Sequence, residues 1–139
     1  LAYAVWSSLI SYSDAGALTI YAGCSTDRVR EVIDLTLAEL AALRSTPVDA
    51  AELQRAKEHL KGSLMLSLES TSSRMSQLAR QELTFGRQFS LDEILGGIEA
   101  VTADDILRVS QDLFRDGAAV ATVVGPAMDG DLTLDQLRI

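Results

Sequence analysis

Two short apolar segments at the start of the chain have the composition of β-strands. Residues 1–10 contain Tyr, Val, Trp and Ile, which favour the pleated conformation, and residues 17–23 again contain Ile and Tyr. The intervening run Ser13-Asp14-Ala15-Gly16 is typical of a turn, in which Gly16 is free to take positive φ. The pattern predicts a β-hairpin. Because a strand begins at Leu1, we also expect further sequence upstream.

Hydrophobic residues then recur at helical spacing. One helix is predicted from Ser25 or Thr26 to about Arg44, and Pro47 marks its break. Three further helix starts share one pattern, in which a capping residue is followed three positions later by an acidic residue and is flanked by a hydrophobic staple. The three pairs are Asp49 with Glu52, Ser90 with Glu93, and Thr102 with Asp105.

The helix that starts at Asp49 is long, since no proline interrupts residues 50–85 and Gly86 is a plausible stop. Its weak points are Gly62 and the polar run at residues 70–73. Residues 118–124 form a nearly continuous apolar run that predicts a buried strand. Segregated strands and helices indicate an α+β fold, with an antiparallel sheet and helices packed on one face. Residues 127–139 are predicted to be a tail, docked by three leucines: Leu132, Leu134 and Leu137.

Composition and charge exclude several classes of function. The 12 Lys and Arg and 20 Asp and Glu give a net charge of −8, which is unsuited to phosphate backbones or to anchoring on anionic lipid. No signal-peptide pattern is present, and the longest apolar stretch is far below the roughly 20 residues that span a bilayer. Cys24 is the single cysteine, so no internal disulfide can form. We therefore expect a reducing compartment, the cytoplasm.

The residues that carry chemistry do not form a complete catalytic set. His59 is the single histidine, and Glu58 and Glu52 near it invite a partial metal site. A catalytic zinc site takes about three protein ligands, so we interpret His59 as a solvated helical residue. Cys24 has no local base to activate it and is interpreted as an inert thiol. The serines at 70–73 lack a nucleophile-elbow pattern, and Gly23 to Ser25 are interpreted as a helix cap rather than a phosphate cradle.

Several segments in order resemble the C-terminal part of the insulinase, pitrilysin and mitochondrial processing peptidase family of zinc metallopeptidases. No one of them is diagnostic, but the ordered set is specific. They are Leu1-Ala2-Tyr3-Ala4-Val5, Tyr12-Ser13-Asp14-Ala15-Gly16, residues 20–25, 53–64, 68–75 and 90–94, and Val123-Val124-Gly125-Pro126.

The resemblance implies that residues 1–126 are the second half of the zinc-free, inactive domain of such a peptidase. In the family, two halves built from homologous α+β domains enclose a chamber. The catalytic half binds zinc through an inverted His-x-x-Glu-His motif and a distant Glu. This sequence has no such motif, and aligning residues 56–64 with the helix of the distant Glu places Ser63 near that ligand position. We therefore expect no metal or cofactor in this chain, with zinc held by the catalytic half or by a partner subunit.

One functional residue carries over by resemblance. The zinc-free domain of the family contributes an Arg and, seven residues later, a Tyr, which reach the substrate backbone or the developing oxyanion across the chamber. Tyr3 matches the Tyr, and the Arg position precedes Leu1. Read from composition alone, Tyr3 is a packing residue.

Two functions remain open at this point. The chain is either the non-catalytic half-domain of a peptidase, closing the chamber and binding extended and preferably basic peptide, or part of a catalytically dead scaffold or partner subunit. An unrelated α+β binding domain is the third alternative. The expected partners are an N-terminal catalytic domain or partner subunit and a peptide substrate. In isolation we expect a homodimer, paired edge to edge or helix face to helix face, because the strands lack the neighbours that should cover them.

Overall fold

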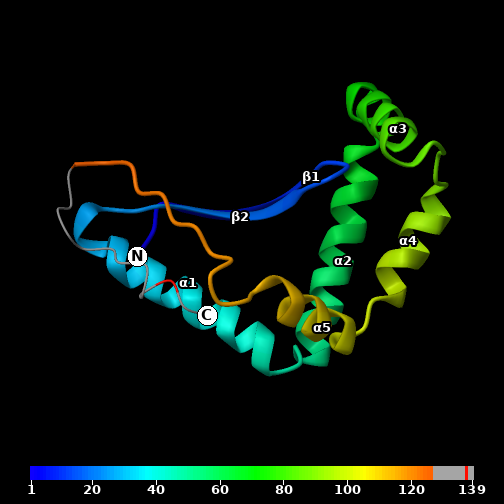
Figure 1. The fold of residues 1–139 in the computed structure, drawn as a ribbon. Coiled ribbons are helices and arrows are strands. Elements are labelled where there is room, and N and C mark those ends of the chain that lie inside the picture. Colours follow the sequence, from blue (N-terminus) through cyan, green and yellow to red (C-terminus); the bar gives the residue numbers. More distant parts are fainter. Residues whose placement is uncertain (127–136, 138–139) are drawn as a thin grey trace. The chain divides into compact units, whose positions relative to one another are not determined.

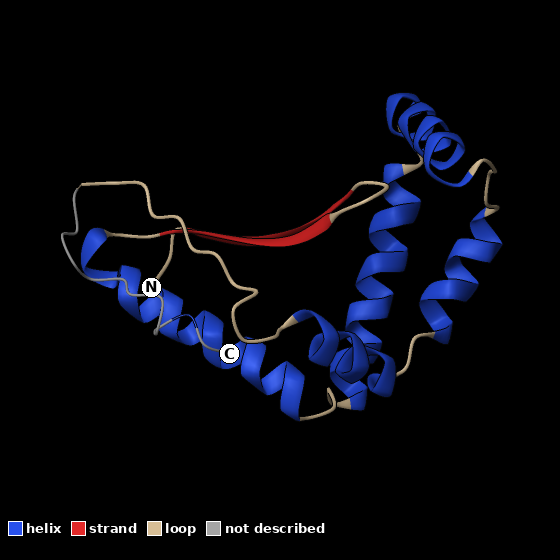
Figure 2. Ribbon diagram, viewed as in Figure 1, coloured by secondary structure: helices blue, strands red, loops and turns tan. Residues whose placement is uncertain are grey.

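The computed structural model describes residues 1–126 and residue 137 and has an α+β architecture (Figures 1 and 2). A two-stranded antiparallel sheet is followed by a run of helices, which confirms the predicted fold class. In chain order the elements are β1 (Ala4–Ser11), β2 (Gly16–Gly23), the 3-10 turn η1 (Thr26–Arg28), α1 (Val29–Ser45), α2 (Ala50–Ser67), α3 (Thr71–Phe85), α4 (Leu91–Ala100) and α5 (Ala103–Leu113).

The chain divides into two compact units. The first contains residues 1–46 and the described residues from 107 onward, and the second contains residues 47–106. The hairpin and α1 belong to the first unit, and α2, α3 and α4 belong to the second. No helix in the described part of the chain is both long enough and apolar enough to cross a bilayer.

The predicted hairpin forms, with β1 paired to β2 from Ala4 opposite Gly23 to Ser11 opposite Gly16. The amide of Tyr12 donates to the carbonyl of Ala15 at 2.8 Å and closes the turn. Gly16 does not use its freedom to take positive φ, since the positive-φ glycines of the described chain are Gly86 and Gly117. Gly16 suits its place for another reason: a Cβ there would lie 3.2 Å from the carbonyl oxygen of Ile10, which is a tight contact.

The two faces of the hairpin carry different side chains, because successive residues of a strand point to opposite faces. Trp6 and Tyr21 stand opposite each other on one face, and their rings stack with centroids 5.1 Å apart. Val5 and Leu9 lie on the other face, where they are 65% and 75% exposed. Both faces of the hairpin are therefore open to solvent.

The predicted helix starts are confirmed by hydrogen bonds. The Asp49 carboxylate accepts from the amides of Ala51 and Glu52 at 2.8 and 3.3 Å. At the start of α4, Ser90 and Glu93 exchange bonds between side chain and backbone, at 2.7 Å from the Ser90 amide and 3.2 Å from the Glu93 amide. This reciprocal arrangement satisfies two amides that would otherwise lack partners.

The start of α5 repeats this arrangement. The Thr102 amide donates to Asp105 at 3.1 Å, and the Asp105 amide donates to the Thr102 hydroxyl at 3.2 Å. Since this reciprocal arrangement needs contacts only between residues three positions apart, the local sequence is enough to specify it.

The long helical segment breaks at the predicted polar run. α2 ends at Ser67, and Ser70 becomes the N-cap of α3, accepting from the Ser73 amide at 3.4 Å. The predicted stop is also confirmed, because Gly86 ends α3 in the left-handed conformation with φ of 64°. Two helices thus replace the single rod that the absence of proline permitted.

Side-chain contacts hold the second unit together. The Lys57 ammonium donates to the Glu99 carbonyl and the Lys61 ammonium to the Glu99 carboxylate, both at 2.7 Å, and these bonds join α2 to the end of α4. Between α3 and α4, the buried Gln81 side chain accepts from the Phe89 amide at 3.1 Å.

The strand predicted at residues 118–124 does not form. This segment is irregular, and Val120 and Val124 are 91% and 94% exposed. An apolar run becomes a strand only when a neighbouring strand satisfies its backbone groups, and no strand of the described chain pairs with it. The predicted leucine tail lies outside the described residues except for Leu137, which is half-buried.

Few side chains of the described residues are buried. Phe114 is the one buried hydrophobic side chain among them, and the polar side chains of Gln81 and Ser110 are buried as well. Apolar residues such as Leu83 and Phe85 are 88% and 63% exposed.

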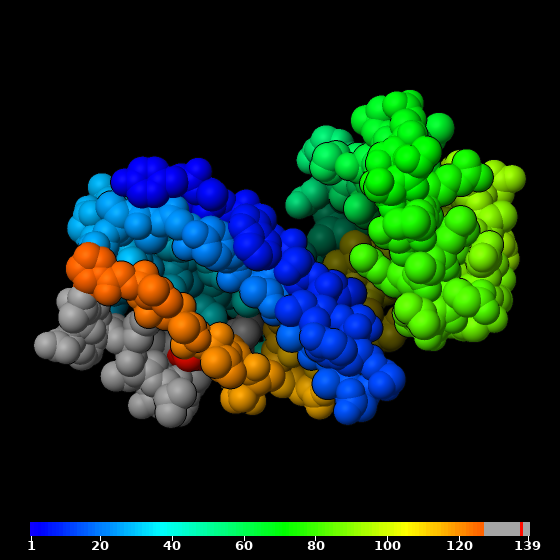
Figure 3. All heavy atoms as spheres, turned by 90° about the horizontal axis from the view of Figure 1, so that it is seen from above, coloured from blue at the N-terminus to red at the C-terminus, as the bar shows by residue number. Residues whose placement is uncertain are grey.

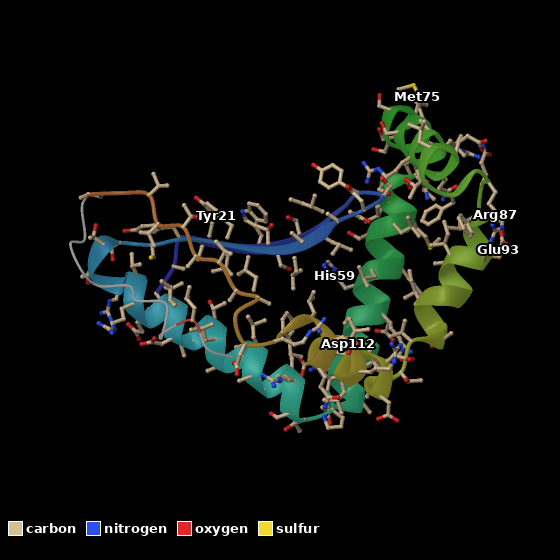
Figure 4. All side chains as sticks on the ribbon, in the orientation of Figure 1. Tyr21, His59, Met75, Arg87, Glu93 and Asp112 are labelled. Atoms are coloured by element: carbon tan, nitrogen blue, oxygen red, sulfur yellow. The ribbon has the colours of Figure 1, made fainter. Side chains whose placement is uncertain are left out.

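We predict that the start of α4 loosens in acid. Hydrogen bonds from the Ser90 amide and from Arg87 hold the pKa of Glu93 below its ordinary value of 4.5. Since the folded-state pKa lies below the unfolded one, this contribution is complete above the unfolded value and is lost as the pH falls through the folded value. Amide exchange in the first turn of α4 should rise in that window (Figure 4).

Two variants test this assignment. Arg87→Gln should raise the pKa of Glu93 only part of the way back to its ordinary value, because the Ser90 amide lowers that pKa more than Arg87 does. A carboxyl NMR titration measures this change. Glu93→Gln should remove the acid-dependent exchange at α4 while exchange at α5 stays unchanged. A Glu93 titration at the ordinary value in the unsubstituted protein would contradict this account.

Candidate functional site

An open hollow lies where the chain enters the hairpin and leaves it. It has a volume of about 390 Å³, and six residues of the first unit line it: Leu1, Ala2, Tyr3, Ser25, Arg28 and Glu31. Figure 3 shows the first residues of the chain, in dark blue, at the molecular surface. This hollow contains the one site residue that the sequence predicted, Tyr3.

Hairpin pairing positions Tyr3. Its amide donates to the carbonyl of Gly23 at 2.6 Å, which extends the β1–β2 ladder by one residue beyond Ala4. The backbone is therefore fixed, whereas the side chain is 84% exposed. A phenol held in this way can donate its hydroxyl proton to an acceptor that approaches from outside.

Arg28 and Glu31 form the charged side of the hollow. The Arg28 Nη1 atom donates to a Glu31 carboxylate oxygen at 2.8 Å, and Arg28 Nε lies 3.5 Å from an Asp27 carboxylate oxygen. The hydrogen bond and charge of Glu31, followed by the charge of Asp27, raise the pKa of Arg28. A hydrogen bond from the Ser25 hydroxyl is the largest cause that lowers the pKa of Asp27.

The groups of the hollow donate hydrogen bonds and hold charge, but they do not assemble a nucleophile with its base. Tyr3 offers a phenol and Arg28 a guanidinium, whereas the Ser25 hydroxyl is engaged by Asp27 and the Glu31 carboxylate by Arg28. Such donors suit a carbonyl oxygen or an oxyanion. The arrangement can bind and orient an acceptor and does not by itself supply the groups for bond cleavage.

The other sequence candidates lie apart from this hollow. His59 is exposed on α2, where Figure 4 labels it, and the adjacent Glu58 accepts a bond from Gln54 at 3.0 Å. Ser63 is exposed on the same helix, and Cys24 is half-buried after β2. Within the described residues no three His, Cys, Asp or Glu side chains come together as a metal site, so the donor set does not fit zinc.

Arg28, at the end of η1, is the residue that sequence reasoning missed. The signal lay in the hairpin register. Once Ala4 pairs with Gly23, the residues before β1 and those after β2 lie at the same end of the hairpin. The position of Arg28 beside Tyr3 thus follows from non-local pairing.

Comparisons with known proteins agree in pointing to one group. The family described as Peptidase M16 inactive domain matches residues 1–60. The zinc protease YmxG of Bacillus subtilis is 39% identical over 123 residues, which cover 88% of this chain and 30% of that protein. The mitochondrial-processing peptidase subunit beta of Neurospora crassa is 36% identical over 126 residues, covering 90% of this chain and 26% of that protein.

A solved structure gives the same result for the fold. A chain of complex III2 from Candida albicans, with Inz-5 bound, superposes with a TM-score of 0.72 at 25% identity, covering 79% of this chain and 27% of that chain. This chain therefore spans under a third of the length of the proteins that it matches.

We predict that the purified chain does not retain zinc through His59. After incubation with one equivalent of zinc and desalting, metal analysis should find the same residual content for the unsubstituted chain and for His59→Ala, because a single imidazole supplies one ligand. Ser63→Ala serves as the matched control one helical turn away. Stoichiometric zinc that disappears in His59→Ala alone would contradict the interpretation of His59 as a solvated residue.

Proposed function

Because this chain belongs to the peptidase M16 family, as part of its inactive C-terminal domain, we propose that it forms a non-catalytic wall of a peptidase chamber and presents Tyr3 to bound peptide. The observation that carries the proposal is the placement of Tyr3, whose backbone is fixed by Gly23 while its phenol is open to solvent. The chain's role is to bind and orient peptide, with the reacting groups supplied from elsewhere in the parent protein or a partner.

The proposed action of Tyr3 is hydrogen bonding to the substrate. Its hydroxyl would donate to a peptide carbonyl oxygen in the ground state and more strongly to the oxyanion that this oxygen becomes during hydrolysis. Zinc would supply the activated water, and we assign that metal to the catalytic half of the parent protein or to a partner subunit, because the described residues here form no zinc site.

A scaffold or partner subunit without activity is the second candidate function. It is supported by the extent of exposed apolar surface, such as Leu9 and Leu83 at 75% and 88%, which suits a protein that is built into an assembly. The matched chain of the Candida albicans structure is itself part of a complex. The two candidates differ in whether Tyr3 affects peptide hydrolysis.

We predict that Tyr3→Phe lowers peptide hydrolysis by the full-length protein. Loss of an oxyanion donor typically reduces kcat by about 100-fold, and KM should change little because the interaction strengthens in the transition state. Tyr12→Phe is the matched control, since Tyr12 is an exposed tyrosine in the hairpin turn. Equal rates for Tyr3→Phe and the control would remove Tyr3 from the reaction, and absence of hydrolysis by the zinc-loaded full-length protein would favour the scaffold.

We also predict that the isolated chain forms a homodimer. The outer edges of both β1 and β2 have no paired strand within the described residues, and uncovered edges promote pairing between chains. Light scattering after size exclusion should give twice the mass of 14.9 kDa. Leu9→Lys on the hairpin should shift the chain toward monomer, whereas Leu83→Lys on α3 should not. A monomer at every concentration tested would show that the edges do not pair.

A further inference from the structure

We propose that Arg28 is a second substrate-binding donor, which holds a peptide carbonyl oxygen beside the one that Tyr3 contacts. The inference rests on the proposed function and extends it to a residue that the sequence did not single out. Arg28 lines the same hollow as Tyr3, although the two are 25 positions apart in the chain.

Backbone hydrogen bonds set the position of Arg28. η1 follows β2 after Cys24 and Ser25, and the Arg28 amide donates to the Ser25 carbonyl at 3.0 Å. Gly23, which ends β2, is the residue that accepts from the Tyr3 amide. A short path of hydrogen-bonded backbone therefore links the two residues, and both side chains line the same hollow.

The guanidinium is held from one side and retains donors on the other. Arginine carries five N–H donors. Nη1 donates to Glu31 at 2.8 Å and Nε faces Asp27 at 3.5 Å, which leaves Nη2 without a partner in the part of the chain that the structure describes. The Arg28 side chain is 52% exposed, so a ligand can approach it from solvent. The two carboxylates thus fix the orientation of a group that can still bind.

Local charge selects the class of acceptor. Arg28 contributes one positive charge, and Asp27 and Glu31 contribute two negative ones, so the group carries a net charge of −1. A ligand carboxylate would be repelled by the two acidic side chains. A neutral carbonyl oxygen escapes this repulsion and still accepts a charge-assisted hydrogen bond. The ligand that fits is therefore the backbone of an extended peptide, and acidic side chains of that peptide do not contribute to binding here.

The test uses the full-length protein and a peptide that it cleaves. Arg28→Gln should lower kcat/KM about 10-fold, mainly through KM, because a hydrogen bond from a charged group is lost in ground and transition states alike. Arg28→Lys should recover part of the loss. Arg30→Gln is the matched control, since Arg30 is an exposed arginine close by on α1 that does not line the hollow.

A substrate series locates the acceptor. Replacing one backbone amide of the peptide by an ester weakens the carbonyl at that position as a hydrogen-bond acceptor. One such ester should slow cleavage by the unsubstituted protein. The same ester should not slow cleavage by Arg28→Gln any further. If Tyr3→Phe is impaired while Arg28→Gln matches Arg30→Gln, the role of Arg28 is overturned and the proposed function stands. If neither Tyr3→Phe nor Arg28→Gln is impaired, the proposed function fails as well. An equal loss of kcat/KM for acidic peptides in Arg30→Gln and Arg28→Gln, with neutral peptides unaffected in both, would indicate a general charge effect and would also overturn the assignment.

Discussion

Antiparallel pairing between β1 and β2 is the interaction on which the candidate site depends. The register that places Ala4 opposite Gly23 fixes the backbone of Tyr3 through the Gly23 carbonyl. A shift by one residue would move every side chain of a strand to the other face. The same shift would separate Tyr3 from the residues that follow β2, and the hollow would lose one of its two sides. The hairpin register therefore determines which side chains line the hollow, and no one side chain defines the site by itself.

The parts of the fold that the sequence predicts well are those fixed by contacts within a few residues. The helix starts at Asp49, Ser90 and Thr102 need only a cap and its partner three positions on, so their pattern is legible in the sequence. The end of α3 at Gly86 is equally local, because a left-handed residue there favours glycine. These elements keep their structure with little burial to support them.

The features that the sequence did not predict depend on neighbours that the local pattern does not specify. Residues 118–124 have the composition of a buried strand, yet composition cannot provide a second strand to pair with. Gly16 does not use its freedom to take positive φ and serves instead through the space it leaves for the Ile10 carbonyl. No local pattern marks Arg28 as a site residue, and the hairpin register brings it into the hollow that Tyr3 also lines. Tyr3 itself was found through resemblance to a family and not from its pattern.

The stacked pair of Trp6 and Tyr21 gives this chain an internal optical reporter. Trp6 is the single tryptophan, and it lies on an exposed face of the hairpin against the Tyr21 ring. Indole emission is sensitive to the polarity around the ring, so its wavelength reports the environment of one defined surface without any added label. Anything that covers this face, whether another domain, a subunit or a peptide, would shift the emission to the blue. Changes in the hairpin can thus be followed in solution independently of changes in the helices.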